Sequence, residues 1–176
     1  MIKVLISENH QLVREGLKMI LSEDPEIKIV GEAQNSIETI EKIQTGNCKI
    51  LILDLNIYGI NGLELISKIK LLKPGLRILV LSLQPEDKFA LLTLKAGASG
   101  YLCTDKALEN LAIAIKRIHK RGWYLSELMI EKMKYEIMPV GADLPHWQLT
   151  GIELRTVCML ASGLKVRDIA SELNLS

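Results

Sequence analysis

Asp54 is the residue with the clearest capacity for chemistry, because it closes the apolar run Ile50–Leu53. A carboxylate at the tip of a buried strand can act as a nucleophile, accept a phosphoryl group or bind a hard cation. Other polar side chains follow apolar runs in the same way, namely Glu8, Asn9, Ser82 and Thr104. Taken singly, each has a plainer explanation as a loop charge, a turn hydroxyl or, for Asn9, a helix cap. Together they predict one site.

The elements that position these side chains follow from two alternating hydrophobic periods up to Gly122. Apolar runs typical of strands alternate with segments of helical spacing, the runs being Ile2–Ile6, Ile27–Val30, Ile50–Leu53, Ile78–Leu81 and Gly100–Leu102. The first, third and fourth runs are nearly continuously apolar, as parallel strands covered on both faces should be, whereas Ile27-Lys28-Ile29 alternates and indicates an edge strand. Five βα units result. They predict an α/β fold with a five-stranded, doubly wound parallel sheet of order 2-1-3-4-5, which is flavodoxin-like.

This topology predicts where the polar residues meet. In open α/β sheets, ligands bind beyond the carboxyl ends of the strands, at the point where the strand order reverses. Glu8, Asn9, Asp54, Ser82 and Thr104 all follow strand ends, so four strands contribute to one site.

Several short motifs in this half resemble the receiver domain of a NarL/FixJ-type response regulator. They are Val-Arg-Glu-Gly-Leu at 13–17, Leu-Asp-Leu at 53–55, Gly59 with Asn61-Gly62, and Lys-Ala-Gly-Ala-Ser-Gly-Tyr at 95–101. The resemblance implies that Asp54 accepts a phosphoryl group from a histidine kinase, with weakly bound Mg²⁺ held by Glu8, Asp54 and the backbone carbonyl of Asn56. It further implies that Ser82 contacts the phosphoryl group and that Tyr101 is the aromatic switch partner.

Three residues depart from the receiver pattern. Asn9 stands where the family carries a second acidic residue, and an amide oxygen binds Mg²⁺ more weakly than a carboxylate does. Thr104 stands where the family carries a lysine that offsets phosphoryl charge, and Lys106 is two residues away. Tyr58 replaces a loop proline and is either a lid over the site or an exposed side chain. We predict an atypical receiver in which Asp54 is poorly phosphorylated; the alternative is a conventional receiver that uses Asp54 and Mg²⁺.

The remainder of the chain divides into a linker and the start of a second domain. His119-Lys-Arg-Gly122 is typical of a helix C-terminus, so the receiver covers 1–122. A linker follows over 123–147, with a helix predicted from Ser126, its N-cap, to Met138. Residues 148–176 open with a Thr150-x-x-Glu153 capping box and resemble the start of an all-α, LuxR-type helix-turn-helix domain. That family continues into a recognition helix, which we expect in a longer form of this regulator; a naturally shortened protein is the alternative.

Charge and composition limit the function classes. The whole chain carries a formal net charge of +1, and the portion after Arg121 carries five Lys or Arg against seven Asp or Glu, net −2, so it lacks a basic DNA footprint. The start reaches acidic residues too soon for a signal peptide, and no apolar run approaches membrane-spanning length, which predicts a cytoplasmic protein.

Three function classes remain. We expect a DNA-binding transcription regulator, a homodimer that binds DNA in its full-length form and acts through dimerisation or interdomain contacts. An interaction antagonist without DNA binding is the second class. An enzyme is not expected, because Asp54-Leu55-Asn56 lacks the second aspartate that related phosphatases use as a general acid.

Overall fold

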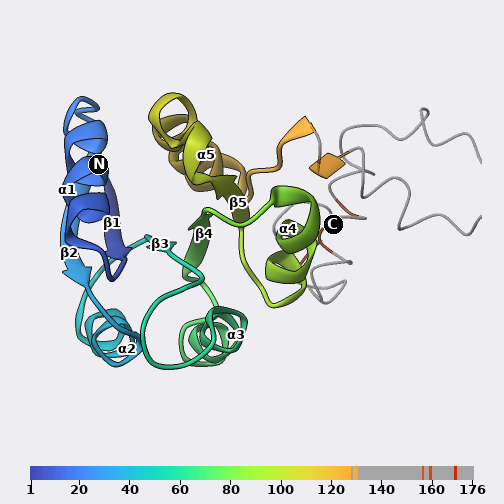
Figure 1. The fold of residues 1–176 in the computed structure, drawn as a ribbon, viewed down its shortest axis with the longest axis horizontal. Coiled ribbons are helices and arrows are strands. Elements are labelled where there is room, and N and C mark those ends of the chain that lie inside the picture. Colours follow the sequence, from blue (N-terminus) through green and yellow to red (C-terminus); the bar gives the residue numbers. More distant parts are fainter. Residues whose placement is uncertain (128, 131–155, 157–158, 160–168, 170–176) are drawn as a thin grey trace, which may run out of the picture.

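The computed structural model describes residues 1–127, 129, 130, 156, 159 and 169, with the side chain of Leu108 left out. Within these residues, five parallel strands form one sheet of order β2-β1-β3-β4-β5, as predicted (Figure 1). Their bounds are β1 Ile2–Ser7, β2 Ile27–Ala33, β3 Ile50–Leu53, β4 Arg77–Ser82 and β5 Gly100–Cys103. The alternating segment forms the edge strand β2, which confirms the inference from its pattern.

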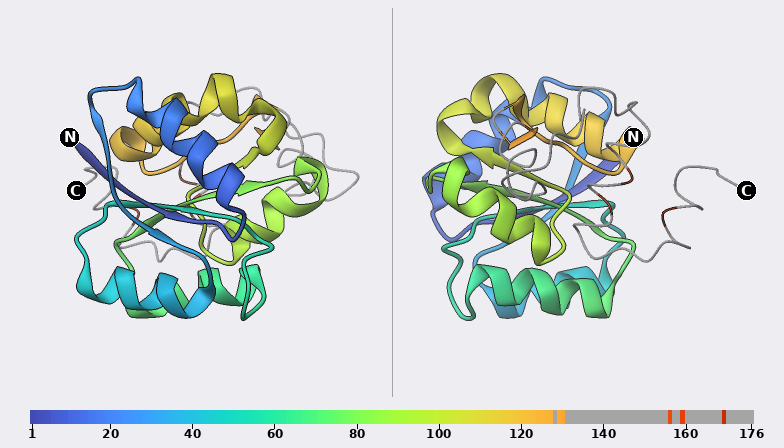
Figure 2. Two further views of the ribbon diagram at one scale, coloured as in Figure 1. Left: turned by 60° about the vertical axis from the view of Figure 1, so that its left-hand side comes forward. Right: turned by 90° about the vertical axis from the view of Figure 1, so that its right-hand side faces the viewer.

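Helices cover both faces of the sheet. Their bounds are α1 Gln11–Ser22, α2 Ser36–Thr45, α3 Gly62–Leu72, α4 Glu86–Lys95 and α5 Ala107–Arg121, with a short 3₁₀ helix, η1, at Thr104–Lys106. In the left view of Figure 2 the sheet is seen nearly edge-on, with α1 and α5 above it and α2 and α3 below. The domain is therefore doubly wound.

The core consists of two apolar clusters, one on each face. Leu51 and Leu53 of β3 belong to the cluster under α2, α3 and α4, whereas Ile50 and Ile52 belong to the cluster under α1 and α5. All four side chains are at most 1% exposed. Burial on both faces explains why this strand is a continuous apolar run that ends abruptly at the first ionisable residue, Asp54.

Helix α5 ends as the sequence predicts. Gly122 caps α5 in the left-handed conformation, with φ of 88°, and its N–H donates to the Ile118 carbonyl. Arg77 Nη1 donates to the last carbonyls of the helix, those of Ile118 at 2.5 Å and His119 at 2.6 Å. A cation therefore sits at the negative end of the helix dipole.

The predicted linker helix begins at its predicted cap. Ser126 Oγ accepts a hydrogen bond from the Met129 N–H at 3.1 Å, and the Ser126 carbonyl accepts one from the Ile130 N–H at 3.0 Å. The rest of the expected helix to Met138 lies outside the described residues. So does most of the expected helix-turn-helix, of which Thr156, Met159 and Ile169 are described as helical. No helix among the described residues is long and apolar enough to cross a membrane.

Candidate functional site

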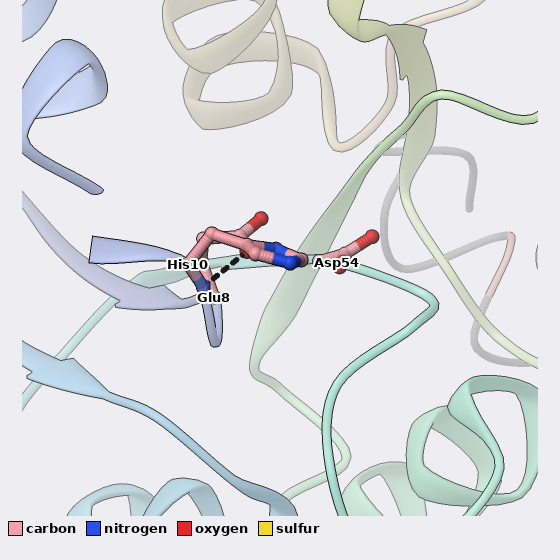
Figure 3. A group of neighbouring side chains, drawn as sticks. All are labelled: Glu8, His10 and Asp54. Carbon is pink, nitrogen blue, oxygen red and sulfur yellow. Dashed lines mark hydrogen bonds and ion pairs between the residues drawn. The ribbon is translucent and has the colours of Figure 1, made fainter. Parts of the chain in front are cut away.

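Two carboxylates and one imidazole meet at the carboxyl end of the sheet. Glu8 follows β1 and Asp54 follows β3, and one ligand atom from each, together with one ring nitrogen of His10, lie within 4.8 Å of one another (Figure 3). Both carboxylates are buried, being 6% and 8% exposed. The backbone fixes them, because the Glu8 N–H donates to the Ala33 carbonyl and the Asp54 N–H donates to the Ser7 carbonyl, each at 3.0 Å. The predicted meeting of these two acids is therefore present in the structure.

Glu8 also contacts His10, the residue that precedes the first helix. Its Oε1 accepts a hydrogen bond from the His10 backbone N–H at 2.8 Å and lies 3.0 Å from His10 Nδ1. His10 is the N-cap of α1 and makes no capping bond with its own side chain. The alternative explanation of Asn9 as a helix cap is wrong, because Asn9 Oδ1 is buried and has no hydrogen-bond partner.

Burial dominates the electrostatics of Asp54. Loss of water raises the pKa of its carboxyl, and the neighbouring Glu8 charge raises it further. Hydrogen bonds from the backbone of Asn56 and Leu55, together with the His10 imidazole, act in the opposite direction without cancelling the increase.

Ser82 and Tyr101 hold the loop that leads into α4. Ser82 Oγ accepts from the Gln84 N–H at 3.2 Å, and the Tyr101 hydroxyl donates to the Gln84 carbonyl at 2.7 Å. Tyr101 is fully buried, and burial raises its pKa to about 12, while a hydrogen bond with Ser82 and the charge of Asp54 also act on it. The two predicted switch residues thus contact one loop, and Tyr101 lies within electrostatic range of the candidate acceptor.

The loop after β3 carries Asn56 and Tyr58. The Tyr58 carbonyl accepts from the Ser36 N–H at 2.8 Å, which fixes this loop against the start of α2. Gly59 takes φ of 113°, and a Cβ there would lie 2.0 Å from Ser36 Oγ, so the position requires glycine. The Tyr58 side chain is 66% exposed, in agreement with the exposed alternative. Its role as a lid stays a prediction.

Thr104 lies just beyond the carboxyl end of β5, in the first position of η1, and is partly exposed. Asp105 and Lys106, the other two residues of η1, are exposed. The chain therefore turns into a helix at the position where the receiver pattern places its lysine.

The donor set of the site fits a divalent cation. Two buried carboxylates supply anionic oxygens, and the unpartnered Oδ1 of Asn9 adds a neutral oxygen in the same loop. Such oxygens are the ligands that Mg²⁺ prefers. The Asn56 carbonyl as a further ligand stays a prediction.

The comparison with protein families decides the identity of this domain. Residues 4–116 match the response regulator receiver domain. The chain belongs to the response regulators. The match covers β2 to β5 and α1 to α4 in full and β1 and α5 in part, so the receiver resemblance inferred from short motifs is confirmed.

The alignments with relatives and solved structures cover the residues of this response regulator that follow its receiver as well as the receiver itself. It is 31% identical over 177 residues to the response regulator UvrY of Escherichia coli K12, a match that covers 100% of this chain and 81% of UvrY. It is also 31% identical to the nitrate/nitrite response regulator NarL of the same strain, over 98% of this chain and 81% of NarL. A structure of the RcsB response regulator of Salmonella typhimurium, described for its conformational dynamism in DNA interaction, aligns with a TM-score of 0.70 and 25% identity, covering 99% of this chain and 84% of that one.

Two residues of this response regulator's site were missed by sequence reasoning. His10 joins the carboxylates, and buried Arg14 donates from Nη1 to the carbonyls of Glu8 at 2.9 Å and Asn9 at 3.0 Å. Arg14 Nε also forms an ion pair with Glu32 at 3.4 Å. The spacing Glu8-x-His10 was a signal for the first. The position of Arg14 within the Val-Arg-Glu-Gly-Leu motif, one turn into α1, was a signal for the second.

Proposed function

We propose that this response regulator is a DNA-binding transcription regulator whose receiver acts through dimerisation and interdomain contacts, with Asp54 a poor phosphoryl acceptor. Its resemblance to UvrY and NarL over nearly the whole chain supports the regulatory role. The RcsB structure, described for DNA interaction, supports DNA as the partner of the full-length form.

The charge around Asp54 carries the proposal. Phosphoryl transfer depends on positioning and on cations that offset charge on the equatorial oxygens. Burial raises the pKa of Asp54, the neighbouring Glu8 raises it further, and the His10 imidazole lowers it. Thr104 contributes a hydroxyl where the family pattern has an ammonium group. An acceptor without that ammonium group lacks one of the cations that offset phosphoryl charge, and is therefore a weak one.

In this proposal, the weak phosphoryl transfer to Asp54 that remains uses Mg²⁺. Glu8, Asp54 and the Asn56 carbonyl would hold it, and when bound it neutralises charge on a transferring phosphoryl group. Asn9 weakens the set, because it replaces a carboxylate by a neutral amide. A histidine kinase is the expected donor if the conventional alternative holds.

Incubation of the chain with Mg²⁺ and acetyl phosphate tests the proposal. Intact mass should show little or no phosphoryl adduct. A stable adduct that disappears in Asp54→Asn would contradict the proposal and favour a conventional receiver.

A gain-of-function pair sharpens this test. Thr104→Lys restores the missing cation at the end of β5, so we expect a clear, Asp54-dependent increase in the adduct. Asp105→Lys adds a lysine at the neighbouring exposed position of η1 and should leave the adduct unchanged. Equal increases in both variants would show that general charge, rather than this position, limits transfer.

Interdomain contact is supported by the start of the linker helix. Leu125 and Met129 are 7% and 4% exposed and belong to the receiver's own core cluster under α2, α3 and α4. Ser126 Oγ also hydrogen-bonds the carboxylate of Glu86, a buried residue in the first turn of α4. The charge of Glu86 raises the pKa of Tyr101, so the linker, α4 and the predicted switch tyrosine share one electrostatic environment.

Homodimerisation is supported by apolar side chains that α1 and α5 leave in solvent. Leu12 and Met19 of α1 are 86% and 72% exposed, and Ile113 of α5 is 46% exposed. These helices pack beside each other on one face of the sheet (Figure 2). A self-complementary contact through this face would bury all three side chains in each protomer.

A further inference from the structure

We propose that His10 is a metal ligand and that the Glu8, His10 and Asp54 site selects a divalent first-row transition ion that accepts nitrogen, such as Zn²⁺, over Mg²⁺. The inference deepens the proposed function, because it concerns the cation of the same site. It does not depend on whether Asp54 accepts a phosphoryl group.

The atoms are already near coordination geometry. His10 Nδ1 and Glu8 Oε1 lie 3.0 Å apart. Two ligands of one such cation, each with a bond of about 2.0–2.2 Å, lie roughly 3.0–3.4 Å apart. The Asp54 carboxylate completes a set whose ligand atoms all fall within 4.8 Å of one another. A cation between Glu8 and His10 therefore takes the place of the hydrogen bond that joins them now.

The surrounding structure holds the oxygens and leaves the imidazole free to adjust. Arg14 binds the carbonyls of Glu8 and Asn9, and the Asp54 N–H donates to the carbonyl of Ser7 at the end of β1. The His10 side chain is 65% exposed, in contrast with 8% for Glu8. The exposed His10 side chain can therefore rotate without disturbing the core.

The donor types decide the preference. Mg²⁺ demands hard oxygen ligands and near-octahedral geometry, and this site offers a neutral Asn9 where an anionic oxygen is expected. An imidazole nitrogen is instead a good ligand for Zn²⁺, Fe²⁺ and related ions, and two carboxylates balance their charge. The presence of Asn9 in place of an acidic residue therefore weakens the binding of Mg²⁺. The presence of His10 strengthens the binding of ions that accept nitrogen ligands.

Calorimetric titration of the whole chain with ZnCl₂ and MgCl₂ tests the inference, with Co²⁺ absorption as a second readout. Zn²⁺ should bind more tightly than Mg²⁺. His10→Ala should reduce Zn²⁺ affinity on the order of tenfold or more and leave Mg²⁺ affinity unchanged. His119→Ala, which removes another exposed histidine at the end of α5, is the matched control and should change neither.

Other outcomes overturn the inference. Equal Zn²⁺ affinity in the wild type and His10→Ala, or Mg²⁺ affinity that falls in parallel, would assign His10 a structural role beside Glu8. Sulfur-to-cobalt charge-transfer bands would place the ion on a cysteine. Phosphoryl transfer is measured separately, so an adduct with acetyl phosphate contradicts the proposed function while leaving the metal preference intact.

Discussion

At the scale of single residues, Asp54 combines a functional position with a cost to folding. Because burial raises its pKa above the usual value of 3.8, the folded state holds the proton more tightly than the unfolded state does. Stability is then lost as pH rises through that pKa, and the ionised form at neutral pH is destabilising. Asp54→Asn should raise the unfolding free energy at pH 7 by on the order of 1 kcal/mol, and the gain should vanish as pH falls below 3.8. Thermal unfolding across pH 3–8 measures this; a gain that persists in acid would contradict the electrostatic explanation.

The raised pKa of Tyr101 likewise makes the stability of the fold depend on pH, but at high pH. Its pKa is raised from 10.0 to about 12 by burial, so the stability it provides is present below pH 10 and is lost as pH rises toward 12. Tyr101→Phe should remove this slope and cost about 1 kcal/mol at neutral pH, because the Gln84 carbonyl loses its donor. Denaturant unfolding at pH 7 and pH 10–11 checks both parts. Tyr58→Phe, at an exposed tyrosine, should change neither.

At the scale of elements, the sequence predicted what hydrophobic periodicity controls. β3 matched its prediction because both of its faces are buried, and α5 ended at Gly122 because a left-handed cap requires glycine. The start of α1 was less predictable. His10 rather than Asn9 is its N-cap, and Glu8 accepts the His10 N–H, since the choice depends on how the loop folds around Arg14. Contacts between loop side chains arise from tertiary geometry, which leaves no period in the sequence.

The junction between α4 and the linker helix is an element-level contact that can be tested. Ser126→Ala removes both the cap of the linker helix and the partner of buried Glu86, so we expect a loss of about 1 kcal/mol and faster hydrogen exchange at the Met129 amide. Glu86→Gln with Ser126→Ala completes a double-mutant cycle, and a coupling energy distinct from zero is expected. Ser67→Ala, at an exposed serine of α3, is the control. If the stability effects of Glu86→Gln and Ser126→Ala are additive, the linker helix and α4 are not energetically coupled through this contact.

At the scale of the whole molecule, a net charge of +1 leaves little long-range repulsion between protomers, so exposed apolar side chains decide association. Met19→Glu on α1 or Ile113→Glu on α5 places a charge within the proposed dimer face and should weaken association by on the order of tenfold. Leu71→Glu is the matched control, because Leu71 is 84% exposed but lies on α3, across the sheet. Light scattering and sedimentation over micromolar concentrations report the equilibrium. A monomeric wild type, or an equal effect of all three substitutions, would exclude α1 and α5 as the dimer face and leave interdomain contact as the route by which the receiver acts.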